Sequence, residues 1–91
     1  PIYTHRASRD LCRIMLKDAA HLNEREAEAI NRKRRRRHQE LVEPLYTQKE
    51  AQQAMRRFHG LDYGDTRRIL PGVWVRLRDA GHILGSAIVE L

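Results

Sequence analysis

The segment Arg76–Ala87 reads RLRDAGHILGSA, and it decides the fold that we expect for this chain. Apolar and polar residues alternate up to Arg78, which is typical of a half-buried strand. A loop follows in which His82 stands between Gly81 and Gly85. The glycines let the backbone take unusual dihedral angles and approach a bulky or charged neighbour. An imidazole at a strand end can ligate a metal or transfer a proton, and it can equally hydrogen-bond within its own turn.

Upstream of this segment, the sequence predicts a short strand followed by helices. Residues 1–4 form the expected strand, and Ser8 is placed to cap the first helix by accepting a backbone N–H. Apolar residues then recur at helical spacing and form one stripe: Leu11, Ile14, Met15, Ala19 and Leu22. Asn23 with Glu26 three residues later predicts the start of a second helix. That helix ends in a run of cations: Arg32, Lys33, Arg34, Arg35, Arg36 and Arg37.

The second half of the chain contains one more predicted helix and then strands. Thr47 with Glu50 forms a capping box, in which each side chain binds a backbone N–H of the other residue. Apolar residues line one face of this third helix: Ala51, Ala54, Met55 and Phe58. Gly60 is its expected C-cap. Glycine-containing turns separate the strands that follow, the last of which covers residues 87–91. The layout predicts an α/β fold with one N-terminal strand, about three helices and then β-strands.

Charge and composition limit the partners that the chain can have. The net charge of +6 and the pI of about 10.2 favour polyanions such as RNA, DNA or an anionic membrane surface, without choosing among them. The apolar stretches are far shorter than the roughly 20 residues that span a bilayer. With one cysteine, the chain forms no intramolecular disulfide, which fits a cytoplasmic location.

Several segments resemble the metallo-β-lactamase-fold hydrolases of the β-CASP group, which includes RNA-processing endonucleases and exonucleases. Residues 79–87, with the sequence DAGHILGSA, resemble the third metal-binding motif of that group. Residues 1–4 with residues 7–11 resemble the strand and helix that follow the first histidine motif of the group. Residues 18–23 resemble the segment before its second helix, and residues 43–47 are also typical of the group. The resemblance covers nearly the whole chain and keeps the same order.

The resemblance implies that residues 1–91 are a single fragment of an αββα metallo-β-lactamase-type domain. Residues 1–59 would form a strand plus a helical segment, and residues 60–91 would form the strands that carry the third metal motif. The parent protein would be a zinc-dependent ribonuclease with two ions, in which a metal-bound hydroxide attacks the phosphorus of RNA.

The same resemblance makes His82 a zinc ligand, with its loop supported by Asp79, Gly81 and Gly85. The group's His-x-His-x-Asp-His motif would precede Pro1, and its bridging aspartate would follow Leu91. The other histidines show no ligand spacing: His5, His21, His38 and His59. Because a zinc site needs three or four protein ligands, we expect the isolated chain to hold no catalytic metal and to be inactive. The absence of an initiator Met and an end within a strand also indicate a piece of a longer protein.

Other functions remain open at this point. The run Arg32–Arg37 could follow an RNA phosphate backbone with salt-dependent affinity, or it could be a solvated helix end. No aromatic residues are interleaved with it, so base stacking is not supported. A non-catalytic scaffold, a basic nucleic-acid-binding module and a hydrolase of small molecules are the alternatives. We also expect unpaired strand edges and apolar faces to cause self-association of the chain.

Overall fold

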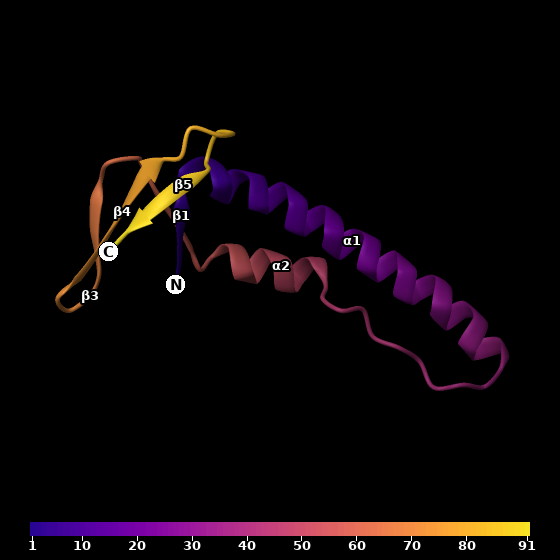
Figure 1. Cartoon of the computed structure of the whole chain (residues 1–91). Coiled ribbons are helices and arrows are strands. Elements are labelled where there is room, and N and C mark those ends of the chain that lie inside the picture. The colour runs from indigo at the N-terminus through magenta and orange to yellow at the C-terminus, as the bar shows by residue number, and fades with distance from the viewer. The chain divides into compact units, whose positions relative to one another are not determined.

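The computed structural model describes all 91 residues and has an α/β fold. The elements in chain order are β1 (Ile2–His5), α1 (Arg6–Arg36), α2 (Gln48–Met55), β2 (Phe58–Leu61), β3 (Thr66–Leu70), β4 (Val73–Asp79) and β5 (Ala87–Glu90). The colours of Figure 1 follow this order. The chain divides into two compact units. We call residues 1–12 and 57–91 the strand unit, and residues 13–56 the hairpin unit.

α1 is one continuous helix where the sequence predicted two. Asn23 and Glu26 lie in its interior, so the prediction of a second helix start there is wrong, and the chain has two helices instead of three. Nothing between Arg6 and Arg36 interrupts the helix, because the segment lacks Gly and Pro and is rich in Ala, Arg and Glu. One asparagine in a helix interior costs at most roughly 0.7 kcal/mol, which is too little to end it.

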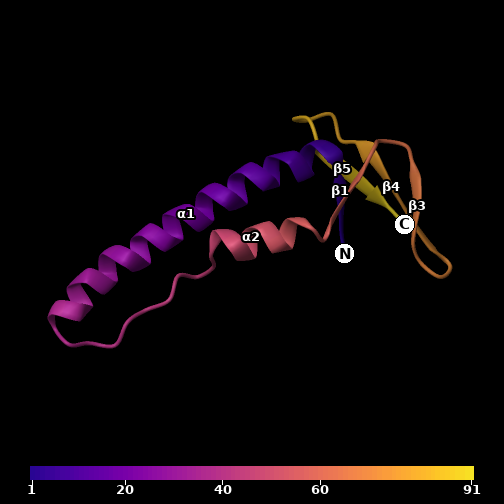
Figure 2. The same ribbon diagram turned by 180° about the vertical axis from the view of Figure 1, so that it is seen from behind.

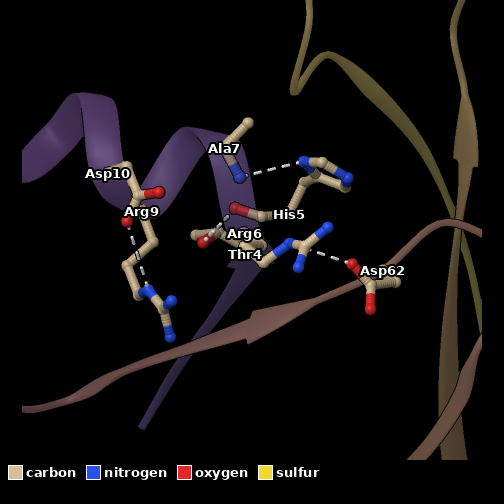
Figure 3. A network of polar contacts seen from close by, with 7 residues as sticks. All are labelled: Thr4, His5, Arg6, Ala7, Arg9, Asp10 and Asp62. Carbon is tan, nitrogen blue, oxygen red and sulfur yellow. Dashed lines mark hydrogen bonds and ion pairs between the residues drawn. The ribbon is translucent and has the colours of Figure 1, made fainter.

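The start of α1 is capped by His5, and the prediction of Ser8 as the cap is wrong. α1 begins at Arg6, so Ser8 lies inside its first turn. His5 Nδ1 accepts the backbone N–H of Ala7 at 3.1 Å, as Figure 3 shows. This bond satisfies one of the amides that the start of a helix leaves without a partner. Since Nδ1 is the acceptor, it is the nitrogen of the His5 ring without a proton.

The end of α1 is closed by a complete Schellman motif around His38. The Gln39 N–H donates to the Arg34 carbonyl at 2.9 Å, and the His38 N–H donates to the Arg35 carbonyl at 3.3 Å. His38 takes a φ of 53°, in the left-handed region where glycine is usual. A side chain in that region costs about 1–2 kcal/mol. The helix therefore ends through a strained residue.

Side-chain hydrogen bonds hold the returning chain and α2 alongside α1 in the hairpin unit. Asn31 accepts the Val42 N–H at 2.8 Å and donates to the Val42 carbonyl at 2.9 Å. Glu24 accepts the backbone N–H of Gln48 at 2.7 Å and its side-chain amide at 2.9 Å. The opposite views of Figures 1 and 2 both show α2 beside α1.

α2 starts as predicted and ends earlier than predicted. Thr47 and Glu50 form both hydrogen bonds of the capping box, so that prediction is confirmed. α2 ends at Met55, whereas Phe58 and Gly60 lie in β2, so the prediction of Gly60 as a helix cap is wrong.

β1 and β2 form a parallel pair that the sequence patterns did not predict. Thr4 stands opposite Gly60 in this pair. A Cβ atom on Gly60 would lie 2.9 Å from Nη1 of Arg9 and 3.2 Å from Cα of Arg6. Glycine at this position therefore allows the first turn of α1 to lie directly on β2.

β3, β4 and β5 form an antiparallel sheet in that order, which confirms the predicted strands of the second half. The alternation predicted for β4 is present, because Val75 and Leu77 are each 5% exposed while Trp74 is 49% exposed. Leu61 of β2 completes the buried cluster. Four half-buried side chains pack against this cluster: Tyr3, Tyr63, Ile69 and Ala87. The core of the strand unit is therefore small and joins both sheets.

The apolar stripe predicted on α1 lies largely in solvent. Four of its side chains are between 49% and 69% exposed: Leu11, Ile14, Met15 and Leu22. The buried residues of α1 are Ala20 and Ala27. Self-association through such an apolar face stays a prediction. None of the helices combines the length and the apolar character that a membrane crossing requires.

Replacing His38 with glycine should stabilise the end of α1, because glycine adopts the observed φ of 53° without a steric cost. We expect a gain of about 1 kcal/mol in the free energy of unfolding, measured by urea denaturation. The matched control is Gln39→Gly, one residue further on and also exposed, where φ is not positive. This control should lower the stability, and an equal loss for His38→Gly would contradict the assignment of strain.

Candidate functional site

The loop between β4 and β5 presents His82 at its tip. Asp79, at the end of β4, accepts the Gly81 N–H at 2.8 Å through Oδ1, and Gly81 takes a φ of 69°. Ser86 donates its backbone N–H and its hydroxyl to the Ile83 carbonyl, at 3.1 Å and 2.6 Å. These bonds close the loop on itself. The imidazole of His82 is exposed and makes no hydrogen bond or ion pair.

Tyr63 connects the C-terminal end of this loop to the rest of the strand unit. Its hydroxyl accepts the Gly85 N–H at 3.1 Å and donates to the Ser86 carbonyl at 2.7 Å. The ring of Tyr63 stacks on the ring of His5, with the centroids 4.0 Å apart and the planes at 23°. His5 itself is 7% exposed. The sequence pattern gave no indication of this stacking.

Ser8 holds the same end of the loop from a second side. Its hydroxyl donates to the Gly85 carbonyl at 2.9 Å. Gly85 is buried and takes a φ of 92°, which favours glycine. A Cβ atom on Gly85 would lie 2.6 Å from the Ser8 hydroxyl oxygen. Gly85 is therefore required both for its backbone angle and for the space beside Ser8.

The loop carries too few metal donors to hold an ion by itself. No group of three or more His, Cys, Asp and Glu side chains lies close enough together to hold a metal ion. His82 fits the role of one ligand, because its ring is exposed and not engaged in a hydrogen bond. Since zinc needs three or four protein ligands, one imidazole does not make a zinc site by itself.

The basic run Arg32–Arg37 lies at the end of α1 and in the turn that follows. Arg34 is half-buried and donates to the Glu40 carbonyl at 2.9 Å, whereas the other five cations are exposed. None of the ion pairs in the structure involves this run. The run belongs to the hairpin unit, and His82 belongs to the strand unit.

The hairpin unit also contains a groove that the sequence did not predict. Arg13 and Lys17 of α1 and Lys49 of α2 line it, together with the apolar side chains of Ala51 and Met55. Its volume is about 430 Å³. Single cations spread over two helices carry no recognisable pattern in the sequence, so this groove could be found only from the structure.

Glu24 is the ionisable group with a clearly shifted pKa. Hydrogen bonds from the side chain and then the backbone of Gln48 hold the pKa of Glu24 below its ordinary value of 4.5, and the nearby His21 lowers it further. The partial desolvation of the carboxylate acts in the opposite direction. The interaction between Glu24 and Gln48 is therefore strongest when Glu24 is ionised.

The chain is similar in sequence to known proteins. No family model matches the chain. It is 36% identical over 91 residues to the transcription termination factor FttA of Thermococcus kodakarensis, and 34% and 31% identical to the factors of that name from Pyrococcus abyssi and Methanocaldococcus jannaschii. The chain is homologous to a segment of FttA. It spans 12% of the length of each of these FttA proteins, and the matched region includes both the His82 loop and the basic run.

Replacing Glu24 with Gln should make the hairpin unit less stable at neutral pH, and the difference from the wild type should shrink in acid. The reason is that the folded-state pKa of Glu24 is lowered. Its contribution to stability is therefore present above the ordinary value of 4.5 and is lost as the pH falls through the folded-state pKa. Unfolding by urea at a series of pH values measures this difference.

The matched control for this experiment is Glu26→Gln, which removes an exposed carboxylate of the same helix. This change should leave the stability at neutral pH nearly unchanged, because Glu26 makes no hydrogen bond in the structure. A Glu24→Gln protein whose deficit grows in acid would contradict the direction of the pKa shift.

Proposed function

We propose that this chain is part of a zinc-dependent RNA-cleaving hydrolase of the metallo-β-lactamase/β-CASP type that acts in transcription termination. Similarity along all 91 residues to proteins named transcription termination factor FttA supports the process. The resemblance of residues 79–87 to a metal-binding motif supports the chemistry. The observation that carries the proposal is the exposed, unengaged imidazole of His82 on a loop whose two ends are fixed by hydrogen bonds.

His82 is the residue that we assign as a zinc ligand. Asp79 would keep the loop in shape through its bond to the Gly81 N–H, and Gly85 would allow the close approach to Ser8. Zinc bound there would neutralise the charge that develops on the phosphate oxygens during cleavage. The remaining ligands would come from parts of the parent protein outside residues 1–91. The assignment of these residues to one metallo-β-lactamase-type domain, divided at residues 1–59 and 60–91, belongs to the same proposal.

His82→Ala should remove both bound zinc and RNA cleavage from the natural protein that contains this sequence. The decrease in cleavage should exceed the roughly 10- to 100-fold effect that is typical of residues outside the first ligand shell. Zinc content by mass spectrometry and cleavage of a labelled transcript are the two measurements. His38→Gly is the control, since it removes an exposed imidazole from the hairpin unit. Full zinc content and full cleavage in His82→Ala would refute the assignment.

The basic run is proposed as a binding surface for the RNA backbone. Its cations are largely exposed and none is paired with a carboxylate, so their charge is available to phosphates. Without aromatic neighbours, such a surface would not read bases. The same observation favours a second candidate function, in which the chain belongs to a non-catalytic RNA-binding or scaffold protein. The His82→Ala experiment separates the two functions, because only the first requires a metal ligand.

Replacing Arg35 and Arg36 with Gln should reduce the salt dependence of RNA binding. For single-stranded RNA, each phosphate that is no longer neutralised lowers the slope of log affinity against log salt by about 0.7, so we expect a change of about 1.4. Binding of the natural protein to oligouridylate at several salt concentrations measures the slope. The matched control replaces Arg67 and Arg68, two exposed arginines of β3. An equal change for both pairs would indicate a general charge effect and would contradict a specific interaction.

A further inference from the structure

The C-terminal end of the His82 loop depends on bonds from outside the loop. Ile83 and Leu84, which follow His82, are 64% and 77% exposed and therefore provide little packing. The first buried residue after His82 is Gly85. Its N–H and its carbonyl are bound by Tyr63 and Ser8, which lie 22 and 77 residues away in the chain. The position of the loop tip therefore depends on the position of Gly85.

One hydroxyl group makes two hydrogen bonds to this end of the loop. Tyr63 Oη accepts from Gly85 and donates to the carbonyl of Ser86, so it binds the two ends of a single short stretch of backbone. A hydroxyl that both accepts and donates restricts its partners in two directions, which a single bond does not do. The orientation of this stretch of backbone thus follows the position of the Tyr63 ring.

The Tyr63 ring is itself held on several sides. Its neighbour Gly64 donates to the carbonyl of Leu77 in β4 at 2.8 Å, and the ring packs against the buried cluster. On another side it stacks on His5, whose orientation is fixed by the cap bond to Ala7. The ring therefore provides a rigid base for its hydroxyl.

The segments that carry His5 and Tyr63 are joined by a second interaction. Arg6 Nε and Asp62 Oδ1 are 3.1 Å apart, and each residue is the direct neighbour of one of the stacked rings. Figure 3 shows this ion pair together with the bond from the Ala7 N–H to His5. Both side chains of the pair are more than half exposed, so the ion pair adds little to the constraint.

We propose that Tyr63 is a positioning residue for His82, acting through its hydroxyl on Gly85 and Ser86, with Ser8 and His5 holding the arrangement. This inference rests on the proposed function, because it assumes that the place of His82 matters for metal binding. The hydroxyl binds the loop backbone, whereas the ring alone supplies the packing against the core. Removal of the oxygen should therefore release the loop and leave the fold intact.

The test is Tyr63→Phe in the natural protein that contains this sequence. Tyr3→Phe is the matched control, since Tyr3 packs against the same core and its hydroxyl makes no hydrogen bond. We expect Tyr63→Phe to lower zinc affinity and kcat by about 10- to 100-fold, with KM nearly unchanged. The visible absorption spectrum of the cobalt-substituted protein should also change, because it reports ligand geometry. Ser8→Ala should act in the same direction, and Tyr3→Phe should match the wild type.

A further measurement does not depend on the reaction. Hydrogen–deuterium exchange of residues 81–86 should be faster in Tyr63→Phe, while exchange in β4 stays as in the wild type. Unchanged exchange in the loop would overturn the proposal. Wild-type kcat and an unchanged cobalt spectrum in Tyr63→Phe would also overturn it. In that case, an inactive His82→Ala protein would still support the proposed function. A fully active, zinc-replete His82→Ala protein would overturn both.

Discussion

The pair of hydrogen bonds made by the Tyr63 hydroxyl is the interaction on which the position of the His82 loop depends. It links a loop whose tip has almost no packing of its own to a core of a few side chains. The stacked His5 ring extends the connection to the start of α1, where Ser8 returns to Gly85. Tyr63 thus contacts the core, the residue that caps α1 and the loop.

Some local signals in the sequence were reliable, whereas pairing between distant segments left no signal in it. The alternation in β4 and the capping box at Thr47 are each contained within a few residues, and both were predicted. Asn23 was misleading, because a residue that often begins helices is tolerated inside one when its neighbours favour helix strongly. The parallel pairing of β1 with β2 joins Ile2 to Phe58, and no short-range pattern indicates such a partner.

The candidate site also combines features that the sequence predicted with features that it did not. The glycines beside His82 predicted an unusual loop, and their positive φ angles explain why glycine is used. Tyr63 and Ser8 gave no such signal, because their roles follow from which residues the fold brings to them. The similarity to FttA supports the proposed process, and the resemblance around His82 supports the proposed chemistry. Neither would have identified the residues that hold the loop.

The two units are stabilised by different forces. The buried side chains of the hairpin unit are three alanines, Ala20, Ala27 and Ala51, and its defined interactions are hydrogen bonds such as those of Asn31 and Glu24. Opening this unit exposes little apolar surface, so its heat capacity of unfolding should be small. Its stability should therefore vary almost linearly with temperature, whereas the strand unit, with its aliphatic and aromatic cluster, should show the curved dependence of a hydrophobic core. On cooling, the strand unit would weaken first, because the hydrophobic driving force fades while the hydrogen bonds of the hairpin persist.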